Sequence, residues 1–371
     1  MPTPQLKKIE EHLQFLVGQR NSFTKQDHLG KTLLPAVMRT DTAFFHNLHY
    51  HQSTDTLETL GIECIRKNAE AATKILKALL KKNIDMYFEN KELTIEVTNK
   101  CAAKCIMCPR DKMIQPLEVM SQSLYEKIVI DAFKMGIETI DLCGYGDVFL
   151  DRGLVENLKF TKNLKPDCKV YISTTANAMI SRYFDDLTKY VDILKFSIYG
   201  TTPEIYKKVM GGLSYEKFKK NIDAFLAMNK KTTYTIGNFI KMKENEHQME
   251  EWIDIWEKKL TEVYVWKPHN YIDGRNYRDI KGQKQTTCGR PLKGPLNVAV
   301  SGKAHVCCFD FNKLMVVGDA KTMTIKEIMN SQEMKKIQKK HQDNDFSDLI
   351  CKNCDQTVKD DTSLIYKSNP L

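Results

Sequence analysis

The sequence lacks the long apolar stretches that mark exported and membrane-spanning chains. Its first residues, Met-Pro-Thr-Pro-Gln-Leu-Lys-Lys, contain no apolar core of the kind found in a signal peptide. No run approaches the roughly 18 apolar residues that a membrane helix requires. We therefore expect a protein that has no membrane partner and that lies in the cytoplasm.

Positive charge is not concentrated in any one segment either. The formal net charge is +9, but the lysines are mixed with glutamates along the chain, as is typical of a solvated surface. This pattern argues against nucleic acid as a partner. The hydrophobic content of 42% is ordinary, and 371 residues allow one large domain or two medium ones with a substantial core.

Against these absences the chain has eleven cysteines. Without an export signal they are expected in a reducing compartment, where thiolates bind metal instead of pairing as disulfides. Cys101, Cys105 and Cys108 form a C-x3-C-x2-C loop directly after a strand-like segment at 93–98. Three thiolates fill three corners of a 4Fe–4S cube and leave one iron open to a small molecule. A zinc site and chance clustering are the alternatives.

From about residue 91 the sequence alternates between strand-like and helix-like segments. We expect strands at 93–98, 138–144, 169–174, 192–199, 232–240 and 262–268, and helices near 121–135, 151–163, 180–190, 214–229 and 245–259. Strands separated by helices predict an α/β fold with a parallel sheet of βαβ units. Ligand-binding residues then belong at the carboxyl ends of the strands, which is where the three-cysteine loop falls.

The loop, its spacing and its placement after a strand resemble the radical S-adenosylmethionine (SAM) superfamily. The resemblance implies a partial (β/α)6 TIM-like barrel at residues 91–280, preceded by a helical region at 1–90. It implies that SAM chelates the open iron of a 4Fe–4S cluster and is cleaved to a 5′-deoxyadenosyl radical, with an electron from a flavodoxin- or ferredoxin-type donor. Met107 stands where the superfamily often has an aromatic residue, and its thioether could pack against adenine.

Three strand ends resemble the SAM pocket of this superfamily. Gly144, Tyr145, Gly146 and Asp147 follow the second expected strand. They are similar to a glycine-rich element whose backbone and acidic side chain meet the methionine ammonium group. Ser173 and Ser197, at the next two strand ends, are implied SAM contacts, Ser197 to the ribose. The alternative is ordinary strand packing, because a single hydroxyl specifies little.

Four later cysteines resemble an auxiliary-cluster extension called SPASM, or twitch in its shorter form, which the resemblance places at residues 281–371. They are Cys288, Cys307, Cys351 and Cys354. They would bind one auxiliary 4Fe–4S cluster on all four irons, which suits electron transfer, whereas tetrahedral zinc is the alternative. Cys308 should point away from Cys307 on a strand, so we do not expect it to be a ligand. His269, Asn270 and Arg290 are candidate substrate contacts, and surface exposure explains them equally well.

The ligand spacing of the extension is most similar to that of the 2-deoxy-scyllo-inosamine dehydrogenases. This implies a radical SAM oxidoreductase that acts on a polar small molecule, such as a sugar or an aminocyclitol. A peptide maturase would use the same clusters, but the β-wing of its usual winged-helix domain is not evident in residues 1–90. A redox-neutral epimerase or decarboxylase would need a hydrogen donor, for which Cys143, Cys308 and Tyr145 are candidates. A non-enzymatic zinc-binding protein is the remaining alternative.

Overall fold

The computed structural model describes residues 90–230, 232–275, 277, 283–358 and 363–368. These residues belong to the second of the two units into which the chain divides, Lys81–Leu371. The helical region predicted at residues 1–90 lies, apart from residue 90, outside the described residues. Across the described ranges no helix is long and apolar enough to cross a membrane.

The strands join in one mixed sheet whose order is β10-β6-β5-β4-β3-β2-β1-β7-β8-β9. β1 to β6 are parallel, as the sequence predicted. Their bounds are β1 (Glu92–Ile95), β2 (Thr139–Leu142), β3 (Lys169–Thr174), β4 (Ile193–Ser197), β5 (Tyr234–Ile240) and β6 (Glu262–Trp266). All six lie within or close to the predicted segments. The α/β fold class and the partial barrel are confirmed.

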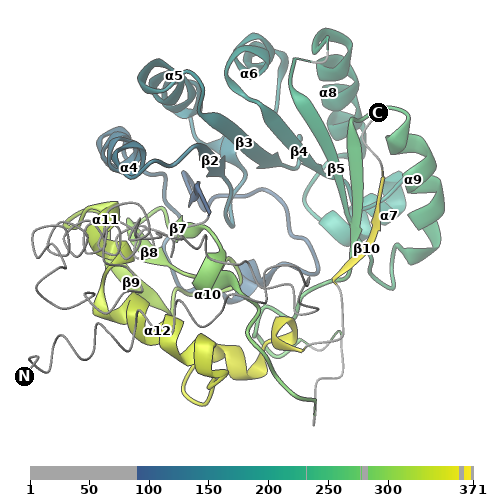
Figure 1. Cartoon of the computed structure of the whole chain (residues 1–371). Coiled ribbons are helices and arrows are strands. Elements are labelled where there is room, and N and C mark those ends of the chain that lie inside the picture. The colour runs from purple at the N-terminus through teal and green to yellow at the C-terminus, as the bar shows by residue number, and fades with distance from the viewer. Residues whose placement is uncertain (1–89, 231, 276, 278–282, 359–362, 369–371) are drawn as a thin grey trace, which may run out of the picture. The chain divides into compact units, whose positions relative to one another are not determined.

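Helices connect these strands along the outer side of the curved row of strands (Figure 1). They are α4 (Gln122–Lys134), α5 (Leu154–Leu164), α6 (Phe184–Tyr190), α7 (Pro203–Met210), α8 (Tyr215–Met228) and α9 (Met249–Glu257). Single 3-10 turns occur at Pro109–Lys112, Val148–Leu150, Ser181–Tyr183, Glu246–Gln248, Ile350–Asn353 and Asp355–Thr357. We did not predict α7, although Thr202 caps it and Pro203 occupies its first position, a frequent start signal.

Alternation along each strand separates an apolar face from a polar one, because successive side chains point to opposite sides. Ile95, Ile140, Ile172 and Leu194 are fully buried in the core that includes the helices. The residues between them face the inside of the barrel, and many of them are polar or charged. This set includes Thr94, Asp141, Ser173 and Lys195. The polar interior is where the candidate site lies.

The chain after β6 continues the same sheet at both edges. It forms α10 (Arg290–Lys293), β7 (Leu296–Val298), β8 (Lys303–His305), β9 (Val316–Asp319), α11 (Ile325–Met329), α12 (Gln332–Asp343) and β10 (Leu364–Lys367). β7 pairs in parallel with β1, β8 and β9 follow antiparallel, and β10 pairs antiparallel with β6. The backbone of β1 is therefore bonded directly to the C-terminal region.

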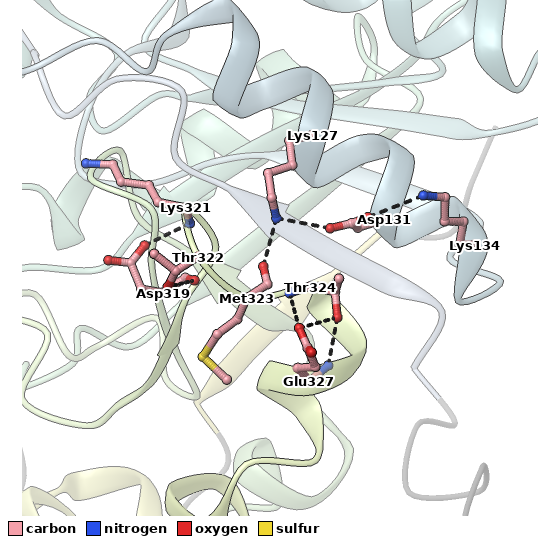
Figure 2. A network of polar contacts seen from close by, with 9 residues as sticks. All are labelled: Lys127, Asp131, Lys134, Asp319, Lys321, Thr322, Met323, Thr324 and Glu327. Carbon is pink, nitrogen blue, oxygen red and sulfur yellow. Dashed lines mark hydrogen bonds and ion pairs between the residues drawn. The ribbon is translucent and has the colours of Figure 1, made fainter.

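Polar contacts join α4 of the barrel to the segment between β9 and α11 (Figure 2). The Lys127 ammonium donates to the Met323 carbonyl oxygen at 2.8 Å and pairs with Asp131 at 3.2 Å. Thr324 and Glu327 form a capping box that fixes the first turn of α11. These contacts hold the C-terminal region against the outer side of the barrel.

Candidate functional site

A cavity of about 340 Å³ lies where the parallel strands end, and its volume is in the range of small-molecule sites. Its lining comes from both parts of the described chain. Polar and thiol side chains on this lining include Glu96, Cys108, Lys195, Ser197, Asn238 and Cys308. The position agrees with the rule that ligands bind at the carboxyl ends of parallel strands.

The three-cysteine loop is shaped by the end of α7. The Lys104 amide donates to the Gly211 carbonyl at 2.6 Å, and the Ile106 amide donates to the Val209 carbonyl at 2.9 Å. Gly212 has a φ of +82°, and a Cβ there would lie 2.5 Å from the Ala102 carbonyl oxygen. Only glycine fits this close approach of two backbones. The helix that we did not predict thus supports the candidate cluster loop.

The thiols of the loop are close enough to one another to interact electrostatically. Burial raises the pKa of Cys108 to about 11, and burial, together with the charges of Cys108 and Cys101, raises the pKa of Cys105 further. Thiols in such a setting keep their protons until a metal displaces them, because the thiolate is the ligand. Three converging thiols, one of which lines the cavity, are the donor set that an iron–sulfur cube with one open iron requires.

Met107 does not face the cavity. Its side chain is only 2% exposed and packs in the hydrophobic core. The expected contact of its thioether with adenine is therefore corrected, because a side chain enclosed by the core offers no surface to a ligand.

The turn at Gly144–Asp147 packs directly against the chain that leads to the cysteine loop. A Cβ at Gly146 would lie 2.0 Å from the Thr98 carbonyl oxygen. The Arg110 guanidinium donates to the Tyr145 carbonyl at 2.5 Å and also bonds the Asn99 carbonyl. Arg110, which the sequence analysis missed, ties the glycine turn to the loop of Cys108. Its place two residues after the last cysteine was the available signal.

Two carboxylates lie at this turn, and they are bound differently. Asp147 is 4% exposed, and its oxygens accept from the Thr174 and Thr175 hydroxyls at 2.6 to 3.1 Å and from two backbone amides. Its carboxylate thus has several protein donors already. Glu96 accepts from the Tyr145 amide at 2.7 Å and also lines the cavity. The role of Asp147 toward a ligand stays a prediction, and Glu96 is a second candidate that we missed.

Ser173 and Ser197 line the cavity, as do Gly144 and Tyr145. Ser173 pairs in register with Lys195 of β4, so the two side chains share a row of the barrel interior. The Lys195 ammonium lies 5.4 Å from the centre of the Tyr171 ring. Lys195 was not predicted, although a lysine among the apolar residues of a strand is itself a signal of a polar interior.

The barrel interior also holds Asp141, whose protonation links stability to pH. Burial raises its pKa to about 7, and nearby Lys195 limits the rise. The unfolded carboxyl has a pKa near 3.9, so the folded state binds more protons between roughly pH 4 and 7 and loses stability as pH rises through that window. Asp141→Asn should therefore melt higher relative to wild type at pH 8 than at pH 5, by roughly 5 °C or on the order of 2 kcal/mol.

Thermal unfolding of both proteins at the two pH values measures this difference. Asp167→Asn, at an exposed aspartate, is the matched control and should show no such dependence on pH. An equal separation between Asp141→Asn and wild type at pH 5 and pH 8 would contradict the prediction.

The four later cysteines come together from three segments of the C-terminal region. Burial, together with the charges of Cys354 and Cys288, raises the pKa of the Cys351 thiol to about 12. Cys354 also lies near Cys307. Backbone amides donate to two of the sulfurs, from Phe309 to Cys307 and from Gln356 to Cys354, each at 3.4 Å. Amide donors of this kind stabilise metal-bound thiolates.

The three predicted substrate contacts lie beside these cysteines and not on the main cavity. The Asn270 amide side chain donates to the Asn353 carbonyl at 2.7 Å, and its backbone amide donates to Asp355 at 2.8 Å. The His269 ring packs 4.3 Å from that of Phe309, and the Arg290 guanidinium covers the same ring at 4.5 Å. These contacts connect the segments that carry the cysteines, and the role of the three residues toward a substrate stays a prediction.

One contact connects the glycine turn with the segment that carries Cys307. The Tyr145 hydroxyl donates to the Cys308 carbonyl oxygen at 2.6 Å. Cys308 lines the cavity, whereas the preceding residue, Cys307, is buried among the later cysteines. This agrees with our expectation that Cys308 points away from Cys307.

Comparisons with known families assign both halves of the described chain. Residues 95–255 match the radical SAM superfamily, and residues 288–355 match the SPASM iron–sulfur cluster-binding domain. No curated protein sequence matches the chain. A radical SAM domain implies a 4Fe–4S cluster with SAM, and a SPASM domain implies auxiliary iron–sulfur clusters.

Several solved structures share the fold at low identity. BtrN in complex with AdoMet and 2-DOIA is 17% identical, with a TM-score of 0.52, over 74% of this chain and 98% of that chain. The structure of anSMEcpe with bound AdoMet is 14% identical, with a TM-score of 0.54, over 74% of this chain and 92% of that chain. Streptococcus suis SuiB bound to precursor peptide SuiA is 15% identical, with a TM-score of 0.57, over 95% of this chain and 82% of that chain. The chain combines a radical SAM domain with a SPASM iron–sulfur cluster-binding domain.

Proposed function

We propose that this enzyme abstracts hydrogen from a polar small molecule, such as a sugar or an aminocyclitol, and oxidises it. The observation that carries the proposal is the junction at Cys307 and Cys308. Cys308 lines the cavity, and Cys307 lies among the cysteines proposed to bind the auxiliary cluster. An electron acceptor bound through Cys307 would therefore lie next to a substrate in the cavity.

The proposed ligand sets follow from the two groups of thiols. Cys101, Cys105 and Cys108 would hold the SAM-binding cluster, and the later set, Cys288, Cys307, Cys351 and Cys354, would hold the auxiliary one. When bound, the first cluster and SAM supply a radical that removes a hydrogen atom, and the second cluster accepts an electron. We propose residues 91–280 for the barrel and 281–371 for the auxiliary domain.

The chain's own residues would bind and orient the two small molecules. The turn at Gly144–Asp147, with Ser173 and Ser197, would hold SAM, and Glu96 offers a carboxylate beside the turn. Lys195 and Asn238 supply further polar groups on the cavity lining, which suit hydroxyl or amino substituents. Oxidation of a carbinol to a carbonyl removes one hydrogen atom, one proton and one electron. A flavodoxin- or ferredoxin-type protein would supply the electron that starts the reaction.

A redox-neutral reaction is the second candidate, because hydrogen donors line the same cavity. The thiols of Cys143 and Cys308 and the Tyr145 phenol all do so, and any of them could return a hydrogen atom to the substrate radical. A peptide substrate is a further candidate, since the fold is shared with SuiB bound to its precursor peptide.

Anaerobic incubation with reductant, SAM and deuterium-labelled sugars, aminocyclitols or peptides tests the proposal. We expect 5′-deoxyadenosine that carries deuterium, together with a carbonyl product from a small molecule. In D2O, an epimerase would place solvent deuterium on the reacting carbon, and Cys143→Ala or Cys308→Ala would prevent it. Deuterium transfer from peptides alone would overturn the substrate class, and the absence of 5′-deoxyadenosine with every candidate would overturn the proposal.

A further inference from the structure

A buried histidine of α12 contacts one of the later cysteines. His341 lies in the last turn of α12 and is 0% exposed. Its Nε2 lies 3.5 Å from the Cys351 Sγ, and its Nδ1 lies 2.9 Å from the Thr287 Oγ1. A fully buried imidazole requires partners for both nitrogens, and these two contacts supply them.

The hydrogen-bond directions follow from the chemistry of the partners. A metal-bound thiolate carries no proton, so the ring nitrogen that faces it must be the donor. The Thr287 hydroxyl oxygen accepts from the Gly289 amide at 3.1 Å, which leaves its own hydrogen for Nδ1. The bonds therefore run from Gly289 to Thr287, from Thr287 to His341, and from His341 to Cys351.

This chain of bonds connects two segments that are far apart in sequence. Thr287 immediately precedes Cys288, and its amide donates to the Asn344 side chain at 2.7 Å. Asn344 ends α12 in a left-handed conformation with a φ of 55°. The Phe346 ring packs against the imidazole, with centroids 5.0 Å apart. The ring is thereby held in one orientation relative to the sulfur.

We propose that His341 is a positioning residue that donates Nε2–H to the Cys351 thiolate and raises the reduction potential of the auxiliary cluster. A hydrogen bond to a ligand sulfur stabilises the reduced, more negative cluster more than the oxidised one. The inference rests on the proposed function in one respect, namely that Cys351 is a cluster ligand. It adds a reason why this cluster would accept an electron from a substrate.

The test is a spectroscopic redox titration of the full-length protein that carries Cys101→Ala, Cys105→Ala and Cys108→Ala, so that only auxiliary iron contributes. His341→Met removes the donor at similar length and should shift the midpoint potential to more negative values. His341→Gln keeps an N–H donor and should recover most of the shift. Thr287→Val keeps the side-chain shape but removes the hydroxyl, and a smaller negative shift is expected. Gln332→Met, at an exposed position of the same helix, is the control and should leave the potential unchanged.

The possible outcomes separate this inference from the proposed function. Loss of all iron and sulfide in the three-cysteine background itself would overturn the auxiliary ligand set. Wild-type iron content with unchanged potentials in His341→Met and Thr287→Val would overturn the role of His341 alone. If His341→Met does not retain iron, Thr287→Val decides, and an unchanged potential there contradicts the proposal.

Discussion

Replacing Cys101, Cys105 and Cys108 together by alanine is expected to abolish 5′-deoxyadenosine formation and leave auxiliary iron in place. The three thiols are the only protein ligands proposed for the SAM-binding cluster, so their loss leaves that cluster without an anchor. The later cysteines belong to different segments and keep their own amide donors. Iron should fall from about eight to about four atoms per chain.

Iron and sulfide analysis, with electron resonance of the reduced protein, measures this result. Cys168→Ala is the matched control, because Cys168 is a buried cysteine of the barrel core that we expect to bind no metal. It should retain both clusters and its activity. Loss of all iron from the three-cysteine variant, or retention of all of it, would refute the division into two independent sites.

Gly146→Ala is expected to lower both SAM affinity and stability. The new Cβ would lie 2.0 Å from the Thr98 carbonyl oxygen, so the turn must move away from the segment that leads to the cysteines. Overpacking of this kind costs about 1–3 kcal/mol. Because the displaced turn lines the cavity, we expect the Kd for SAM to rise at least about tenfold, which corresponds to about 1.4 kcal/mol.

Equilibrium binding of SAM to the anaerobically prepared protein, with a thermal melt, measures both effects. Gly153→Ala is the matched control, since a Cβ there would lie no nearer than 3.4 Å to another side chain. It should leave SAM affinity and the melting temperature close to those of wild type. Wild-type SAM affinity in Gly146→Ala would show that the turn does not shape the SAM site.

Much of the barrel could be predicted because its signals are local. Runs such as Val170 to Thr174 alternate between core and interior positions, and glycine, serine and threonine mark where helices begin. The cysteine loop was found for the same reason, because its three ligands lie within eight consecutive residues. We did not predict α7, although Thr202 and Pro203 are signals of a helix start. The segment is short, and it follows a strand end that we had interpreted as part of the pocket.

The C-terminal strands could not be predicted from local pattern. β7 has three residues, too few for a recognisable period, and it forms only because β1 offers a free edge. The auxiliary cysteines were predicted from their resemblance to a family. We predicted that His269, Asn270 and Arg290 contact the substrate, but not which residues of the chain they contact in the fold. Asn270 is held by Asp355 and Asn353, residues more than eighty positions away.

The order of residues was enough to predict a radical SAM domain, through the family resemblance of the three-cysteine loop, and the match at residues 95–255 confirms that domain. The three thiols proposed to bind iron lie within one loop after a strand, so no distant segment is needed to recognise them. Tertiary structure decided what surrounds those thiolates: that Glu96 and not only Asp147 lies at the glycine turn, that Cys308 faces the cavity, and that His341 reaches Cys351. These are contacts between segments far apart in sequence, and they depend on how the sheet and helices pack, which local patterns do not encode.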